Sequence, residues 1–128
     1  MDSFSTSIQF ASFEMSARDR IKFKDITDAV KIDEYTANNG SFTAEIAGYV
    51  ILNIHNPKSK NNPDYHNYVY IGTDGKKYVS GSESLWNAFS EIKDELAADN
   101  DTDPITLTFY RVPSKNYAGK DFLSCSLA

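Results

Sequence analysis

The chain has 128 residues, of which 41% are hydrophobic and 13% aromatic, and its formal net charge is −5. One domain of this size can bury a core without a metal or a disulfide, and the aromatic content excludes intrinsic disorder. The single cysteine, Cys125, excludes an internal disulfide and favours a reducing compartment. Because no apolar stretch approaches the roughly 20 residues of a membrane helix and no secretory signal is present, we expect a cytoplasmic protein that does not contact membranes.

The N-terminal third contains weaker structural signals than the rest. Residues 1–15 place apolar side chains among serines and predict either a mobile arm or a short strand, and residues 16–128 then form a single domain. Basic and apolar residues alternate from Arg20 to Lys24, which predicts a half-buried strand that residues 29–32 continue. The Asn39-Gly40 dipeptide predicts a hairpin turn.

The remaining elements follow from clear changes of period. Strands are predicted at residues 42–54, 65–72 with 76–79, 105–110 and 122–127. The dipeptide Asp74-Gly75 predicts the turn between the two halves of the third strand. Residues 82–97 carry their apolar side chains on one helical face and acidic residues on the other, so they predict a helix. Long polar loops are expected at residues 55–64 and 113–119.

The order of these elements predicts a mostly β fold. Three strands, one helix and two strands are the order of a five-stranded OB-fold-like barrel, with one α-helix between the third and fourth strands. A β-sandwich and an α+β sheet with one covering helix contain the same elements, and they remain alternatives.

The expected register leaves aromatic side chains on the polar face of four strands. These outward rings are Tyr49, Tyr68, Tyr70, Tyr110 and Phe122. Residues of the same strand ends, turns and loops complete the predicted site: His55, Lys58, Lys60, Lys76, Lys77, Arg111, Lys115, Tyr117 and Lys120. Bases stack on exposed rings while cations follow the phosphates, so the pattern predicts binding of single-stranded DNA. The alternative is that these tyrosines pack under another element of an ordinary sheet.

Two segments also resemble a known type of protein. The segments DGKKYVSGSESLWN, residues 74–87, and YRVPSKNYAGKDF, residues 110–122, resemble a small-phage type of single-stranded DNA-binding protein. The resemblance covers roughly residue 18 to the end of the chain. It implies an OB-fold and sequence-independent coating and protection of single strands during phage replication or recombination, hence a place in the host cell cytoplasm. The chain ends Ser124-Cys125-Ser126-Leu127-Ala128 and departs from the acidic tail of cellular single-stranded DNA-binding proteins.

We expect a binding protein rather than an enzyme. The sequence contains no catalytic motif, and His55 and His66 have no acidic or cysteine partner at metal-ligand spacing, so neither a metal nor another cofactor is expected. The acidic segment 94–103 is expected to contact replication or recombination proteins, and a homo-oligomer remains open. The alternative function is that of an acidic protein-binding module, such as a phage inhibitor of a host protein.

Overall fold

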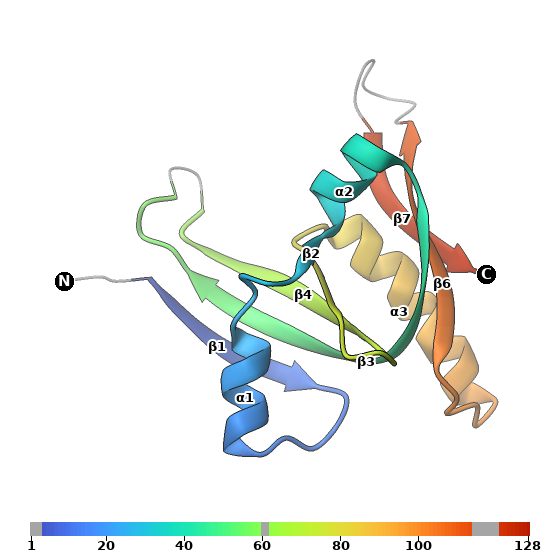
Figure 1. The fold of residues 1–128 in the computed structure, drawn as a ribbon, viewed down its shortest axis with the longest axis horizontal. Helices are drawn as coiled ribbons and strands as arrows, with labels where there is room; N and C mark the ends of the chain where they lie inside the picture. The colour runs from blue at the N-terminus through green and yellow to red at the C-terminus, as the bar shows by residue number, and fades with distance from the viewer. Residues whose placement is uncertain (1–3, 60–61, 114–120) are drawn as a thin grey trace.

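The computed structural model describes residues 4–59, 62–113 and 121–128 and shows a curled, mostly β structure with three helices packed around the sheet (Figure 1). The strands follow the order β2-β5-β4-β3-β6-β7, and β1 pairs with β3 beside this path. The elements in chain order are β1 (Ser5–Ala11), α1 (Ala17–Lys24), β2 (Val30–Lys31), α2 (Ile32–Asn39), β3 (Phe42–His55), β4 (Asp64–Gly72), β5 (Lys77–Ser80), α3 (Glu83–Ala98), β6 (Ile105–Pro113) and β7 (Asp121–Leu127).

The long strand β3 organises the sheet because it pairs along both of its edges. One edge pairs with β4 over Ile46–His55, with a bulge near Gly48. The other edge is shared, since Phe42–Ile46 pairs with β6 and Val50–His55 pairs with β1. A strand shared in this way curls the sheet into half a barrel (Figure 1). The Asp-Gly turn between β4 and β5 is confirmed, and Gly75 has the positive φ that favours glycine.

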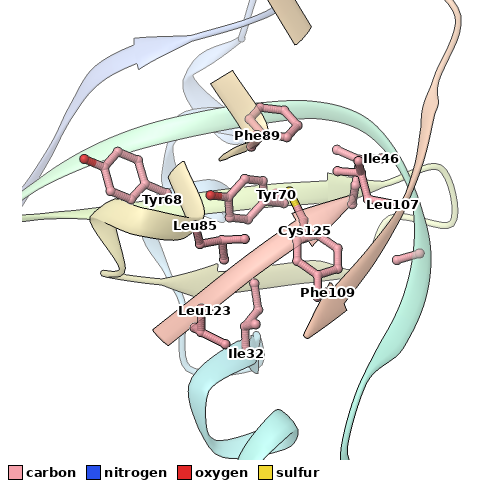
Figure 2. Packing of buried hydrophobic residues seen from close by; sticks show 11 residues of the cluster. Ile32, Ile46, Tyr68, Tyr70, Leu85, Phe89, Leu107, Phe109, Leu123 and Cys125 are labelled. Carbon is pink, nitrogen blue, oxygen red and sulfur yellow. The ribbon is translucent and has the colours of Figure 1, made fainter. Parts of the chain in front are cut away.

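Both faces of β4 are covered, so the molecule has two apolar clusters. The aliphatic cluster consists of Phe23, Val50, Leu52, Ile54, Val69, Ile71 and Val79, with Phe23 supplied by α1. The aromatic cluster lies between α3 and the sheet and consists of Ile32, Ala44, Ile46, Tyr68, Tyr70, Leu85, Phe89, Leu107, Phe109, Leu123 and Cys125 (Figure 2). Side chains alternate along a strand, so successive residues of β4 enter different clusters.

Helix α3 confirms the strongest helix prediction. The Ser82 side chain accepts a hydrogen bond from the Leu85 amide and caps the helix start, while Leu85 and Phe89 are buried on its inner face. The helix joins β5 to β6, as the sequence indicates, and it packs closely against β7 (Figure 1).

The predictions for the N-terminal third are wrong in two places. The expected strand at Arg20–Lys24 is helix α1, which begins at a capping box formed by Ser16 and Asp19. The expected hairpin turn at Asn39-Gly40 is the end of α2, because Gly40 adopts φ +85° at the helix C-terminus. Residues 5–11 form a paired strand, which decides between the two possibilities for the N-terminal stretch.

The five-stranded, one-helix barrel is therefore corrected to seven strands and three helices within the described residues. The segment from β3 to β7 keeps an OB-like order, with α3 before the last two strands. In the described residues β5 and β7 do not pair, and β2 instead pairs in parallel with the outer edge of β5. None of the described helices combines the length and apolar composition that a membrane span needs.

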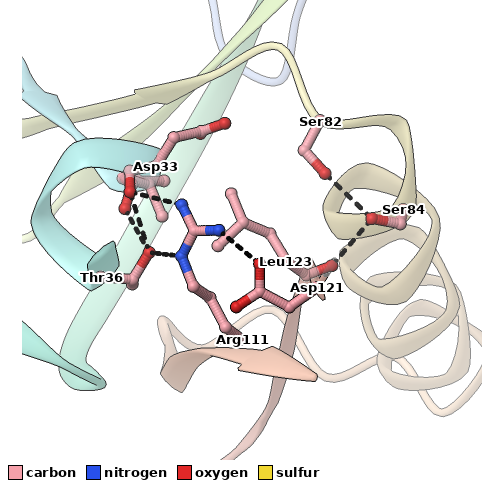
Figure 3. A network of polar contacts seen from close by, with 8 residues as sticks. Asp33, Thr36, Ser82, Ser84, Arg111, Asp121 and Leu123 are labelled. Atoms are coloured by element: carbon pink, nitrogen blue, oxygen red, sulfur yellow. Dashed lines mark hydrogen bonds and ion pairs between the residues drawn. The ribbon is translucent and has the colours of Figure 1, made fainter. Parts of the chain in front are cut away.

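A polar network joins the open ends of the half-barrel (Figure 3). Arg111 on β6 donates to Thr36 Oγ1 and the Asp33 carbonyl of α2, and it pairs with Asp121 of β7 at 3.0 Å. The Asp33 carboxylate accepts a hydrogen bond from Ser80 at the end of β5. Helix α2 thus links β5 to β6 by hydrogen bonds across the opening of the half-barrel, and Arg111 extends the network to β7.

Candidate functional site

A hollow with a volume of about 670 Å³ lies beside the connection between β3 and β4. We call it the polar hollow because almost all of its lining side chains are polar. Its lining residues are Ser5, Ser7, Asn53, Ile54, His55, Asn62, Asp64, Tyr65, His66, Asn67, Gly81 and Glu83. Volumes of 300–1,000 Å³ are typical of ligand pockets, and this hollow combines such a volume with mainly polar lining residues, of which Ile54 and Tyr65 supply apolar surface.

Two carboxylates in the polar hollow already have partners. His55 Nδ1 lies 2.6 Å from Asp64 Oδ1, an arrangement set by the direct pairing of these residues across β3 and β4. The Tyr68 hydroxyl donates to the Glu83 carboxylate, whose two oxygens both lie 2.9 Å away. Burial of the phenol and this hydrogen bond raise the pKa of Tyr68 to about 12. Both carboxylates therefore use part of their hydrogen-bonding capacity within the protein.

A cluster of stacked rings lies on the same face of the sheet. The ring cluster consists of Phe10 on β1, Tyr49 on β3, Tyr68 on β4 and Trp86 on α3. Trp86 stacks on Tyr68 with centroids 4.7 Å apart and an interplanar angle of 6°, and Phe10 stacks on Tyr49 at 5.8 Å. Trp86 is half-buried, whereas Phe10 is 50% exposed. The cluster therefore presents both an open ring and a partly open ring to solvent.

A cation lies over these rings. Lys93 lies about two helical turns beyond Trp86 on α3. Its Nζ is 5.7 Å from the Tyr49 ring centroid and 6.0 Å from that of Trp86. Its ammonium group also pairs with Asp94 at 2.7 Å. Cation–π contacts of this kind favour a positive charge beside an aromatic surface.

Strand register makes the polar hollow and the ring cluster neighbours. Asn53 pairs with His66, Ile51 with Tyr68, and Tyr49 with Tyr70. Alternate residues of a strand share a face, and each such step along the strand covers about 7 Å. The exposed Asn53 and His66 side chains are therefore one step from the Trp86-Tyr68 stack. Together, the hollow and the rings form one surface between β1 and the first half of α3.

The expectation that Tyr68 and Tyr70 face solvent is wrong. Tyr68 is 4% exposed and Tyr70 is 0% exposed, because α3 covers the face of β4 that the sequence interpretation left open (Figure 2). Tyr70 packs edge-on against Phe89 and Phe109, with centroids 5.0 and 5.7 Å away. Neither ring is free to stack on a ligand. Leu127 at the end of β7 is 58% exposed.

Two predicted cations are occupied by structural contacts. Lys77 is buried, and its ammonium group donates to the carbonyls of Lys22 and Asp25 and pairs with Asp28 at 2.8 Å. It therefore anchors the end of α1 to β5 instead of facing a phosphate. Arg111 is half-buried in the network with Asp33, Thr36 and Asp121 described above.

The other predicted residues do not gather on one face. Tyr49 and His55 lie on the face of β3 described above, Lys58 is exposed on the following loop, and Lys76 is exposed at the β4–β5 turn. Half-buried Tyr110 and exposed Phe122 lie on β6 and β7, at a distance from the β3–β4 connection (Figure 1). Lys60, Lys115, Tyr117 and Lys120 lie outside the described residues.

Several residues of the surface were not predicted from the sequence as site residues. Trp86 belongs to the apolar face of the helix predicted at residues 82–97, and it is half-buried where it packs against the edge of the aromatic cluster. The spacing of Trp86 and Lys93, seven residues apart, is the one signal that places both on the same side of α3. The sequence pattern does not distinguish three further residues of this surface from ordinary strand residues: Phe10, Asn53 and His66.

The single cysteine, Cys125, is buried. Burial raises the pKa of the Cys125 thiol to about 11, which keeps it protonated at neutral pH. Among the described residues, no group of three or more histidine, cysteine or carboxylate side chains is placed to hold a metal ion.

Comparison of the chain with family models, with curated proteins and with solved structures finds no match. The resemblance to phage single-stranded DNA-binding proteins therefore stays a prediction from two sequence segments.

Proposed function

We propose that the protein binds single-stranded DNA, with little sequence dependence, across the polar hollow and the ring cluster. The observation that carries the proposal is the 50% exposed Phe10 ring and the half-buried Trp86 ring next to a polar hollow of about 670 Å³. A base stacked on an aromatic side chain contributes about 1–3 kcal/mol and does so for any base. The adjoining amide, imidazole and hydroxyl groups supply hydrogen bonds to base edges and sugar.

The geometry favours single strands over duplexes. The rings lie in a surface between a strand and a helix, where only an unpaired base presents its face. Helix α3 exposes Glu91, Asp94 and Glu95, which disfavours insertion of this helix into a groove lined by phosphates. Protection of single strands during phage replication or recombination is the role we infer, and the sequence resemblance is what supports that part of the proposal.

Binding by this surface relies on stacking more than on charge. Of the cations predicted to follow the phosphates, Lys77 and Arg111 are held by protein groups. Lys58 and Lys76 are exposed, but only Lys58 belongs to a loop beside the polar hollow. We therefore expect binding to weaken less with salt than it does for a protein that contacts many phosphates.

The experiment is a fluorescence-anisotropy titration of a labelled oligothymidylate and of a hairpin duplex. Phe10→Ala is expected to weaken single-strand binding about 5- to 150-fold, the range for losing a stacked base. Phe122→Ala is the matched control, since it removes another exposed ring from β7, outside the ring cluster. Weaker binding by the Phe122 variant alone would move the binding face to β6 and β7, and equal affinity for the duplex would contradict the proposal.

A further inference from the structure

A second exposed surface lies on the far half of α3, away from the polar hollow. An apolar groove is formed by Ile92 and Leu96 of α3 and Leu127 of β7, and Glu91 and Glu95 form its rim. Its volume is about 260 Å³. Leu127 is 58% exposed, so the apolar floor of the groove is open to solvent. An adjoining hollow of about 510 Å³ is lined by Glu91, Asp94, Glu95 and Ala98.

The two hollows share a wall, which combines two kinds of attraction. Glu91 and Glu95 line both the apolar groove and the acidic hollow. A ligand that places an apolar side chain against Leu127 therefore reaches carboxylates with the residues beside that anchor. Phosphate and other anions are disfavoured there, so this surface does not extend the proposed nucleic-acid face.

Along the fully described helix α3, the carboxylates of Glu91 and Glu95 lack neighbouring cations that would balance their negative charge. Glu91 and Glu95 are one helical turn apart, and like charges at this spacing repel each other. The last turn of α3 contains no basic residue, although the C-terminal end of a helix favours cations. Within the described residues, Lys93 is the single cation of α3, and it pairs with Asp94 on the side of the ring cluster. A ligand cation at this end of the helix would relieve both unfavourable interactions.

We propose that this groove docks a basic amphipathic segment of a partner protein, with an apolar anchor against Leu127 and lysine or arginine side chains against Glu91 and Glu95. Charge complementarity selects this occupant over a second copy of the chain, because a copy would bring the same acidic rim toward itself. The proposal goes beyond single-strand binding and does not depend on it.

The probe is a labelled 15-residue peptide of leucine and lysine, with the leucines on one helical face. Leu127→Ser is expected to weaken its binding at least about tenfold, because the exposed anchor surface is removed. The double variant Glu91→Gln with Glu95→Gln is expected to weaken it by a similar factor and to lower its salt dependence. Glu14→Gln with Glu34→Gln is the matched control, since it changes the net charge equally with carboxylates that do not line the groove.

Four controls make the test decisive. A scrambled peptide of the same composition should bind weakly, and equal binding would contradict docking in a shaped groove. Equal losses from both double variants would overturn the proposal in favour of attraction by net charge alone. Sedimentation that shows a dimer of the protein abolished by Leu127→Ser would overturn it in favour of a second copy. Thermal melting of each variant checks that the fold survives, which the exposure of Leu127 predicts.

Discussion

The two faces of β4 differ in chemistry and in what covers them. One face packs Val69 and Ile71 into the aliphatic cluster, which Phe23 of α1 completes. The other packs Tyr68 and Tyr70 into the aromatic cluster under α3, and this cluster continues into the exposed rings and the polar hollow. The difference shows that one strand can contribute to a closed core on one side and to an open surface on the other. The candidate binding surface lies on the aromatic side of β4, where Phe10 and Trp86 reach solvent.

The largest expected effect concerns the cover of the aliphatic face. Phe23 is the one buried residue of α1, so Phe23→Ala removes the main apolar anchor of that helix. We expect a loss of about 3–5 kcal/mol in the free energy of unfolding, as for other buried phenylalanines. Denaturant unfolding measures this loss. Single-strand affinity of the folded variant should stay unchanged, and a specific loss of binding would place the ligand on the aliphatic face instead.

A second substitution is expected to stabilise the protein. The Tyr70 hydroxyl is buried without a hydrogen-bond partner among the described residues. Tyr70→Phe removes this unsatisfied group and keeps the ring contacts with Phe89 and Phe109. We expect a gain of about 1–2 kcal/mol in the free energy of unfolding. A clear loss of stability would show that the hydroxyl has a partner.

The neighbouring tyrosine should behave in the opposite way. Tyr68→Phe keeps the stack on Trp86 but removes the hydrogen bond to the Glu83 carboxylate. Because Glu83 is exposed, we expect a loss of only about 1 kcal/mol. Thermal melting of the two Tyr→Phe variants side by side gives the comparison, and a shift in the same direction for both would contradict the assigned roles.

A further expected effect is a dependence of stability on alkaline pH. The pKa of Tyr68 is raised from 10.0 to about 12, so the folded state holds its phenolic proton more tightly than the unfolded chain does. This contribution to stability is complete below pH 10 and is lost as the pH rises through about 12. The residues of the aliphatic cluster carry no ionisable group. Between pH 10 and about 12, the free energy of unfolding should fall less steeply with pH for Tyr68→Phe than for the parent protein. Identical slopes of this free energy against pH would contradict the assignment.

The sequence predicts the segment from β3 to β7 well because its periods change sharply between strands and helix α3. The N-terminal third is different, since the alternation at Arg20–Lys24 is also compatible with a helix whose single inward residue is Phe23. The capping pair Ser16 and Asp19 was a helix signal of the same strength. Asn39-Gly40 serves a helix end as readily as a hairpin, because both need a residue with positive φ.

The candidate site was harder to predict than the fold. In β4, Tyr68 and Tyr70 alternate with Val69 and Ile71. Because both faces of the strand then carry apolar groups, the sequence does not reveal which face is exposed to solvent. Only the placement of α3 settles their burial. The ring cluster depends on β1, whose pairing with β3 brings Phe10 against Tyr49 from 39 positions away in the chain. No local pattern contains such a contact.

Trp86 provides the most direct test of single-strand binding at this surface, because it is the single tryptophan of the chain and belongs to the ring cluster. The measurement is its intrinsic fluorescence during titration with an unstructured oligothymidylate, and in parallel with a hairpin duplex. Stacking of bases on the ring cluster predicts saturable quenching by the single strand, a smaller change with the duplex, and a weaker response in Phe10→Ala. Single-strand binding that leaves the Trp86 emission unchanged would contradict the assignment of this surface.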